Sequence, residues 1–294
     1  MKKDIITILA LIMLISCGCS IERKNPTDPL SSNYIGWHFI GTIGSFSVLA
    51  DFVATPDHIY CVDSYDLMAY KYKTDGTYVL GWGNNPPPAA PIFTSPNALC
   101  VSNQHIIIMD RGAGRFIVFN EADLNDNWPL NVVNAADRIT AGPANIIYAA
   151  VSNPPAVKSY TFDFAGKTIT AYHDITLPPD LIENISEIAW HYSSGNLLIA
   201  DSAQQKISVI TTAGDFVKDI FIGKSVQGFA LKGSSIYVPT EDGIMIYSYE
   251  TGLKTGSMAD YGNGSGKVIR PSIIRIASDY VFTGEKNSIK LFGP

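Results

Sequence analysis

The sequence predicts an all-β fold, a six-bladed β-propeller built from four-stranded antiparallel blades. Three observations support this prediction. Short apolar runs of strand length alternate with turn residues along most of the chain, and almost no helical periodicity competes with them. The runs group into units that repeat about every 45 residues, as propeller blades do. The strands at the two ends of the repeat region complement each other, as a closed ring requires.

The clearest unit lies at His58–Gly83, HIYCVDSYDLMAYKYKTDGTYVLGWG. It contains three apolar or aromatic runs, and the two joints between them, DSYD and TDG, carry turn residues. A further strand, Val48–Ala54, precedes the unit and completes a group of four. Such a meander cannot bury both of its faces alone, so its recurrence along the chain decides the architecture.

Five similar groups follow in order, and a single helical turn is expected within them, at Asp180–Glu187. The second group reads ALCVS, HIIIMD, RFIVFN and a weaker run near Trp128–Val133. The third reads ADRITAG, NIIYAAV, AVKSYTFD and ITAYHDI, and the fourth reads SEIAWHY, GNLLIADS, KISVITT and FVKDIFI. The fifth reads QGFALKG, SIYVPT, GIMIYSY and LKTGSM, and the sixth has only SIIRIAS, YVFTG and SIKLF.

The sixth group lacks an outer strand, whereas Trp37–Ile43 is an apolar run without a partner beside it in sequence. Pairing of Trp37–Ile43 with Ser288–Phe292 would supply the missing strand and remove a free sheet edge that invites aggregation. The second strands of the six groups end at positions separated by 47, 41, 50, 39 and 44 residues. Six blades are therefore predicted, and seven is the alternative count.

An apolar strand ending in Asp-Ser, a short turn, a second strand and a Gly turn make up the recurring motif. It is carried best by IYCVDSYDLMAYKYKTDGTYVLGWG and LLIADSAQQKISVITTAGDFV, and partly by IIIMDRGAGRFIVF. This motif resembles the NHL-repeat class of six-bladed propellers. The third, fifth and sixth groups lack the Asp, so the resemblance is specific in about two blades.

The first residues differ in character from the rest of the chain. Lys2 and Lys3 precede an apolar run of signal-peptide length, which is too short to span a bilayer. The following LISC tetrad resembles the bacterial lipobox, which implies that residues 1–16 are a lipoprotein signal peptide and that Cys17 is lipidated. An ordinary secretory signal and lipidation at Cys19 are the alternatives. Residues 17–33, with two prolines and little apolar content, are expected to be a flexible tether to a propeller at residues 34–294.

Composition and charge limit the classes of partner. The chain has 294 residues, of which 46% are hydrophobic and 16% charged, so an extensive core is expected. Removal of residues 1–16 takes two Lys and one Asp from 21 basic and 27 acidic residues, which leaves a net charge of −7. Without a block of Lys or Arg, nucleic acid is not an expected partner. Cys61 and Cys100 lie in apolar strands, where buried free thiols are favoured over a disulfide, although sequence does not decide between them.

Three carboxylates end the second strands of their groups, namely Asp63, Asp110 and Asp201. Their repetition at one place favours Asx-type turns, in which the carboxylate accepts backbone N–H bonds, over chelation of a cation. No catalytic residue is predicted, because a serine nucleophile motif is absent from the sequence and no base is identifiable. The five histidines are scattered, and His191 is the only histidine placed for a role in the central channel.

Ser95-Pro96-Asn97 is similar to part of the metal site of calcium-dependent lactonases with six-bladed propellers. That resemblance implies calcium bound by several oxygen ligands. The candidates for such a metal site are Asn97, Glu187 and Asp201, with Asp51 and Asn145 as further oxygen donors. The favoured prediction is that no cofactor is bound, and calcium is the alternative.

Two long connections, Gly83–Phe93 and Pro178–Ile185, are expected at the same end of the ring. The first carries the predicted partner-binding residues Asn84, Asn85, Pro86, Pro87 and Pro88, where proline stiffens the loop. The predicted function is a monomeric, lipid-anchored binding platform for a protein, peptide or glycan in the bacterial cell envelope. The outer membrane is favoured, and its side is left open. The alternatives are a metal-dependent hydrolase, lactonase or lyase with its site at the channel, and a lipoprotein with a purely structural role. Both loops are also explained as simple spacers between blades.

Overall fold

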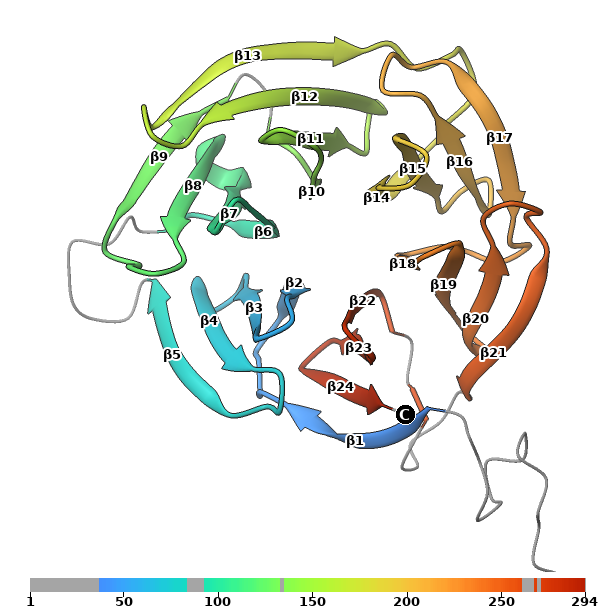
Figure 1. Cartoon of the computed structure of the whole chain (residues 1–294), viewed down its shortest axis with the longest axis horizontal. Coiled ribbons are helices and arrows are strands. Elements are labelled where there is room, and N and C mark those ends of the chain that lie inside the picture. Colours follow the sequence, from blue (N-terminus) through green and yellow to red (C-terminus); the bar gives the residue numbers. More distant parts are fainter. Residues whose placement is uncertain (1–36, 84–92, 133–134, 261–266, 269–270, 294) are drawn as a thin grey trace, which may run out of the picture. The chain divides into compact units, whose positions relative to one another are not determined.

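Six four-stranded antiparallel sheets form a closed ring in the computed structural model of the chain (Figure 1). The structure describes residues 37–83, 93–132, 135–260, 267–268 and 271–293. Trp37–Gly293 make up one compact unit, the propeller. The predicted signal peptide, the tether with Cys17, and the loop residues Asn84–Pro88 lie outside the described residues.

Each blade contributes one strand to each of four concentric layers. The inner strands are β2 (Leu49–Ala54), β6 (Pro96–Ser102), β10 (Arg138–Ala141), β14 (Ile185–His191), β18 (Ala230–Lys232) and β22 (Ile273–Ala277). The second strands are β3 (His58–Asp63), β7 (His105–Asp110), β11 (Ile146–Val151), β15 (Asn196–Asp201), β19 (Ser235–Thr240) and β23 (Tyr280–Glu285). The third strands are β4 (Met68–Lys73), β8 (Arg115–Asn120), β12 (Ala156–Asp163), β16 (Lys206–Ile210), β20 (Gly243–Ser248) and β24 (Ser288–Gly293). The outer strands are β5 (Tyr78–Gly83), β9 (Asn127–Asn131), β13 (Thr168–Ile175), β17 (Phe216–Phe221), β21 (Lys254–Asp260) and β1 (His38–Ile43).

The outer strand β1 closes the ring, as the sequence predicts. It pairs antiparallel with β24, with Ile43 opposite Ile289, although it comes from the other end of the described chain. Two backbone hydrogen bonds extend this junction into the first blade, from Phe46 N to Asn287 O and from Leu49 N to Lys286 O, at 2.8 and 3.0 Å. Six blades are confirmed, and the alternative of seven is wrong.

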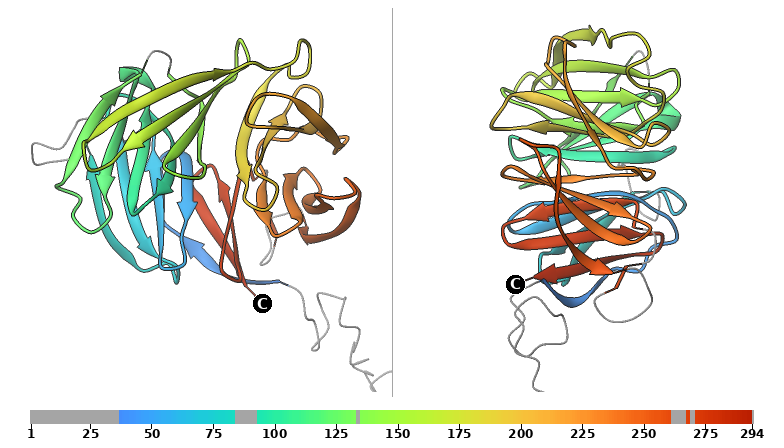
Figure 2. Two further views of the ribbon diagram at one scale, coloured as in Figure 1. Left: turned by 45° about the horizontal axis from the view of Figure 1, so that its top comes forward. Right: turned by 90° about the vertical axis from the view of Figure 1, so that its right-hand side faces the viewer.

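The hydrophobic core is divided among the contacts between neighbouring blades. Six clusters of buried side chains in the described residues each combine residues from two adjacent blades. Phe52 of the first blade and Phe282 of the sixth belong to one cluster, so the junction closed by β1 is packed like the others. The stacked sheets are seen edge-on in Figure 2. Cys61 and Cys100 are both buried and free, as favoured from the sequence.

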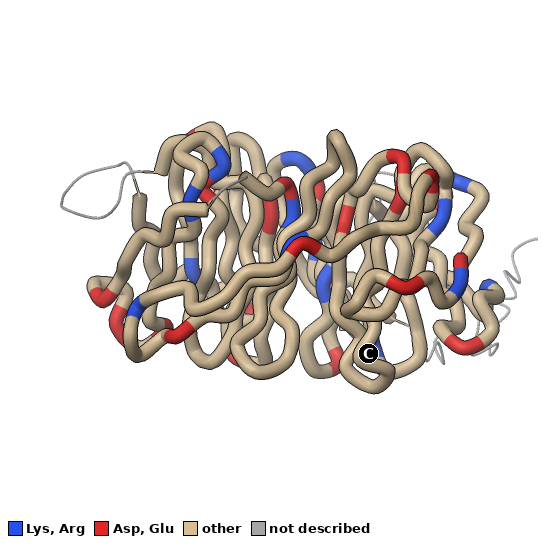
Figure 3. The backbone as a smooth tube through the Cα atoms, turned by 90° about the horizontal axis from the view of Figure 1, so that it is seen from above, with Lys and Arg blue, Asp and Glu red and all other residues tan. Residues whose placement is uncertain are grey.

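Helix is nearly absent from the part of the chain that the structure describes. The expected helical turn at residues 180–187 is wrong, because this segment is a turn and a bend that lead directly into β14. A three-residue 3₁₀ turn, η1 (Arg111–Ala113), follows β7 instead. No helix among the described residues is long and apolar enough to cross a membrane. Figure 3 shows basic and acidic residues interspersed around the ring.

Candidate functional site

Three buried carboxylates fix the connections at one end of the ring. Asp63 accepts hydrogen bonds from the backbone N–H groups of Tyr65 and Asp66 in the turn after β3, both at 3.0 Å. It also accepts the N–H groups of Ser47 and Val48, which precede β2, at 2.7 and 3.2 Å. One carboxylate therefore holds both the following turn and the segment that leads into the inner strand.

Asp201 repeats this arrangement in the fourth blade, whereas Asp110 in the second blade holds only the segment before the inner strand. Asp201 accepts the N–H groups of Ala203 and Gln204 at 3.0 Å, and also those of Glu183 and Asn184, at 2.7 and 3.3 Å. In the second blade, Asp110 accepts the N–H groups of Thr94 and Ser95, at 3.0 and 2.7 Å, and its second oxygen faces the guanidinium of Arg115 at 3.3 Å. The predicted Asx-type turns are confirmed at Asp63 and Asp201. The prediction is wrong at Asp110, whose carboxylate does not cap the 3₁₀ turn that follows it. The bonds to the preceding segments were not predicted.

The blades with this carboxylate also share a β-bulge at the start of the inner strand. The pairing shifts between Leu49 and Asp51 in β2, between Pro96 and Ala98 in β6, and between Ile185 and Glu187 in β14. A bulge inserts one residue and re-aims the side chains that follow it. In β2 and β14 the residue after the bulge is acidic.

Three charged residues reach the same height in the channel. Asp51 lies opposite Val62, Arg138 opposite Ala150, and Glu187 opposite Ala200, and each partner is the fifth residue of its second strand. Equivalent register in a ring places them around the same cross-section. The first, third and fourth blades thus contribute an acid, a base and an acid.

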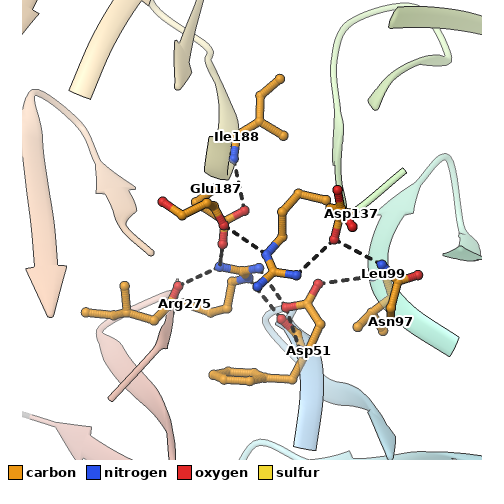
Figure 4. A network of polar contacts seen from close by, with 11 residues as sticks. Asp51, Asn97, Leu99, Asp137, Glu187, Ile188 and Arg275 are labelled. Atoms are coloured by element: carbon orange, nitrogen blue, oxygen red, sulfur yellow. Dashed lines mark hydrogen bonds and ion pairs between the residues drawn. The ribbon is translucent and has the colours of Figure 1, made fainter. Parts of the chain in front are cut away.

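Arg275 of β22 joins this group from the sixth blade and connects the two acids (Figure 4). Its Nη2 lies 2.8 Å from Asp51 Oδ1, and its Nη1 lies 3.0 Å from Glu187 Oε2. The side chains of Asp51 and Glu187 are only 2% and 4% exposed, and that of Arg275 is 17% exposed. These residues and Arg138 are called the channel cluster.

The channel cluster also satisfies backbone groups of the inner strands. Arg275 donates to the carbonyl oxygens of Phe52 and Ile274, both at 2.9 Å. Asp51 accepts the N–H groups of Phe52 and Leu99, at 2.8 and 3.1 Å. The remaining bonds of this kind join the Ile188 N–H to Glu187 and Arg138 Nε to the Ser186 carbonyl oxygen, at 3.1 and 3.0 Å.

Burial and mutual attraction act against each other in this cluster. Burial raises the pKa of Asp51 above its ordinary value, and the neighbouring Glu187 adds to this, whereas Arg275 and Arg138 oppose it. Burial lowers the pKa of Arg275, but the two carboxylates outweigh burial, so that this pKa is raised. Two acids and two bases leave no net charge, which is the condition under which buried ions are tolerated.

A cavity of about 240 Å³ lies in the channel beside the cluster. Glu187 and Arg275 line it, and the inner-strand regions of all six blades contribute to its walls. The lining continues to the last residues of β2 and β10, Ala54 and Ala141. The cavity therefore extends from the channel cluster toward the end of the ring opposite the carboxylate-held connections.

The structure brings together only some of the predicted metal-site candidates. Glu187 and Asp51 share the channel cluster, and the Asn97 side chain donates to the carbonyl oxygens of Ala136 and Asp137 at its edge, at 3.0 and 3.1 Å (Figure 4). Asp201 is not part of the channel cluster, because its carboxylate is bonded in the turn after β15. Among the described residues, no group of three or more His, Cys, Asp or Glu side chains is placed to hold a metal ion.

The candidate channel histidine packs against the next blade. His191 is buried and stacks on the ring of Tyr249, with centroids 4.0 Å apart. Its Nδ1 lies 2.8 Å from Ser194 Oγ, and its Nε2 lies 3.2 Å from the carbonyl oxygen of Gly233. These contacts join the fourth and fifth blades, so His191 has a structural role in packing them together.

Sequence reasoning missed the two arginines of the channel cluster. Arg138 and Arg275 each interrupt an apolar inner strand, in ADRITAG and SIIRIAS, and Asp51 does so in VLADFVA. A charge within an inner strand is the signal that could have identified them, since that strand borders the channel.

No protein-family model matches the chain, and no curated protein matches it in sequence. Two solved structures are similar in fold. One is a protein of unknown function from Bacteroides thetaiotaomicron, with a TM-score of 0.65 and 11% identity, covering 88% of this chain and 76% of its own. The other comes from a nidogen/laminin complex, with a TM-score of 0.57 and 12% identity, covering 74% of this chain and 79% of its own. At such low identity these likenesses establish the propeller fold alone.

Proposed function

We propose that the chain is a lipid-anchored protein of the bacterial cell envelope, and that its propeller is a rigid platform that binds another envelope protein. The observation that carries this proposal is the set of carboxylates at one end of the ring. Asp63, Asp110 and Asp201 hold the segments before three inner strands by backbone hydrogen bonds.

Loops that are ordered before binding lose less conformational entropy when a partner docks, so preorganised loops favour affinity. The described ends of the chain on either side of residues 84–92, at Gly83 of β5 and at Phe93 before β6, lie at this same end of the ring. Tyr65 lies in the turn that Asp63 holds, and its aromatic side chain is 75% exposed. Exposed tyrosine is a common anchor in protein interfaces. The nidogen/laminin structure adds that a chain of similar fold occurs in a protein complex.

A matched pair of tyrosines tests which end of the ring binds. Tyr65 lies in the turn after β3, and Tyr192, at 85% exposure, lies in the turn after β14 at the opposite end. The first step of the test is to cross-link the full chain in envelope preparations, and then to identify and purify the cross-linked partner. We expect Tyr65→Ala, and replacement of residues 84–91 by a Gly-Ser linker, to weaken binding of that partner about tenfold or more. Tyr192→Ala should leave it unchanged. Equal binding by all variants would refute the platform.

The proposed anchor is tested separately. Replacement of Cys17 by Ser removes the thiol that would be acylated, so the chain should move from the membrane fraction to the soluble fraction after cell breakage. A double variant with both Cys17 and Cys19 replaced by Ser removes the alternative lipidation site as well. Retention of this variant in the membrane fraction would contradict lipid anchoring. The binding of a purified partner does not depend on this outcome.

One observation favours the metal-dependent enzyme as a second candidate. Asn97 Oδ1 is buried, has no hydrogen-bond partner among the described residues, and lies at the edge of the channel cluster. An amide oxygen of this kind is a ligand that calcium accepts. For this candidate, millimolar calcium should raise the melting temperature by mass action, and Asn97→Ala should abolish the rise. An unchanged melting temperature would remove the candidate.

A further inference from the structure

The channel cavity is bordered by the unpaired edges of six strands. Each inner strand pairs only with the second strand of its own blade, so its other edge faces the channel. In an antiparallel strand, alternate residues direct their N–H and C=O groups to the partner strand or away from it. The unpaired groups need other hydrogen-bond partners.

The channel cluster shows which residues present these groups. Phe52, Leu99 and Ile188 use N–H groups to bond the carboxylates of the cluster, and Ile274 uses its C=O group to bond Arg275. By the alternation of the strand, the residues two positions further along also face the channel. These residues are Ala54, Val101, Trp190 and Ile276, and all four line the cavity.

The register extends this ring to the remaining blades. Ala141 and Leu231 lie opposite the second residue of their second strands, as do the four residues above. Five of the six side chains at this level are aliphatic, and the sixth, Trp190, carries an indole N–H that has no hydrogen-bond partner among the described residues. None of the six therefore bonds the main-chain groups as the cluster does. The cavity thus combines apolar flanks with a circle of main-chain donors and acceptors. Thr140 adds one hydroxyl to the lining.

The chemistry of this lining selects a class of ligand. An ion is disfavoured, because Asp51, Glu187, Arg138 and Arg275 already balance one another and the rest of the lining is uncharged. A neutral ring with hydroxyl groups around its rim can form hydrogen bonds with the circle of main-chain groups. The C–H faces of such a ring can pack against the apolar flanks of the cavity and against the aromatic ring of Trp190. At about 240 Å³, the cavity is smaller than the sites of drug-sized ligands, about 300–1,000 Å³, and suits one such ring.

We propose that the channel cavity binds a single neutral sugar ring. The site is independent of the proposed platform, since it lies in the channel and extends toward the opposite end of the ring. Two sources share this chemistry, a free monosaccharide and the terminal unit of a glycan.

The test is calorimetric titration of the purified full chain in detergent. Probes are glucose, galactose, mannose, N-acetylglucosamine and their methyl glycosides, at concentrations up to about 10 mM, which covers millimolar affinities. Glucuronic acid and glucosamine serve as charged probes of similar size. We expect saturable binding of at least one neutral sugar and at least tenfold weaker binding of the charged probes. Retention of binding by the methyl glycoside assigns the site to a glycan terminus, and its loss assigns it to a free sugar.

Two variants narrow the cavity from different blades. Ala54→Leu and Ala141→Leu should each weaken binding tenfold or more, and Thr140→Val, which keeps the side-chain size but removes the hydroxyl, should weaken it severalfold. Ala213→Leu, at an exposed turn between β16 and β17, is the matched control and should bind like the wild type. The proposal is overturned if no neutral sugar binds, if charged probes bind as tightly, or if folded narrowing variants retain affinity.

Discussion

Replacement of Arg275 by Met should destabilise the propeller more than removal of any exposed cation. Met keeps much of the length of the side chain but removes the guanidinium. The change leaves the carboxylates of Asp51 and Glu187 buried, 2% and 4% exposed, without the cation that lies within 3.0 Å of each. It also leaves the carbonyl oxygens of Phe52 and Ile274 without their donor.

The expected cost follows from the burial of the pair. Breaking a buried ion pair by removal of one partner costs about 3–5 kcal/mol, because the remaining charge is uncompensated. For a domain of this size, each kcal/mol lowers Tm by roughly 2–4 °C. We therefore expect a decrease in Tm of about 10 °C, with Arg138 as the remaining cation near Asp51 limiting the loss.

Urea unfolding followed by far-ultraviolet circular dichroism measures this free energy. The matched control is Lys232→Met, which removes a cation paired with Asp279 at 3.1 Å, where the side chains are 36% and 78% exposed. An exposed pair of this kind contributes less than about 1 kcal/mol. An Arg275→Met variant within about 1 kcal/mol of the wild type, or no worse than the control, would refute the assigned role of the cluster.

The dependence on pH provides a second check. Burial already raises the pKa of Asp51 in the folded chain, and loss of Arg275 removes a group that opposes this rise. A carboxyl with a folded pKa above its unfolded value favours folding in its neutral form, so its penalty increases as pH rises above about 4. The destabilisation by Arg275→Met should therefore be largest near neutral pH and should decrease toward pH 4. A penalty independent of pH would show that Asp51 is not the affected group.

Three further perturbations test other parts of the fold. Asp63→Ala removes the acceptor of four backbone N–H groups and should lower the free energy of unfolding by about 3 kcal/mol or more. Amide hydrogen exchange should become faster only in the turn after β3 and in the segment before β2. Unchanged exchange there would contradict the role assigned to Asp63. Ile43 of β1 is 2% exposed and packs in the core between the first and sixth blades. Ile43→Asp should lower stability by more than about 3 kcal/mol and promote aggregation, whereas Ile40→Asp on the same strand, 53% exposed, should do neither. Cys61 and Cys100 are buried, and burial raises the pKa of both thiols. Iodoacetamide should therefore leave both thiols unmodified in the native chain and alkylate both in urea, as measured by mass spectrometry. Rapid alkylation of the native chain would show that the blades open.

The strands were predictable because their determinants are local. Apolar runs bounded by turn residues, such as the one that ends at Asp63, are visible within about ten residues of sequence. Ring closure by Trp37–Ile43 was also predictable, because a propeller leaves no other place for an unpaired apolar strand. The turn at Asp201 followed from its similarity to that at Asp63.

The channel cluster could not be predicted in the same way. Asp51 and Arg275 are 224 residues apart in sequence, and their contact exists only when the ring is closed. Asp51 and Glu187 share a level because bulges shift the register of β2 and β14, and bulges leave no clear trace in a strand pattern. The position of each charged side chain thus depends on the whole ring, whereas each strand depends on its neighbours in sequence.

The pairing of β1 with β24 also sets an order of events during synthesis. β1 is made before every other described strand, but its partner is made after all of them. The last blade therefore stays incomplete until the chain has been extended through β24, and a product truncated earlier exposes an unpaired edge at each side of the gap. Such edges recruit proteases and chaperones or cause aggregation. The pairing that completes the ring can therefore form only after β24 has been made.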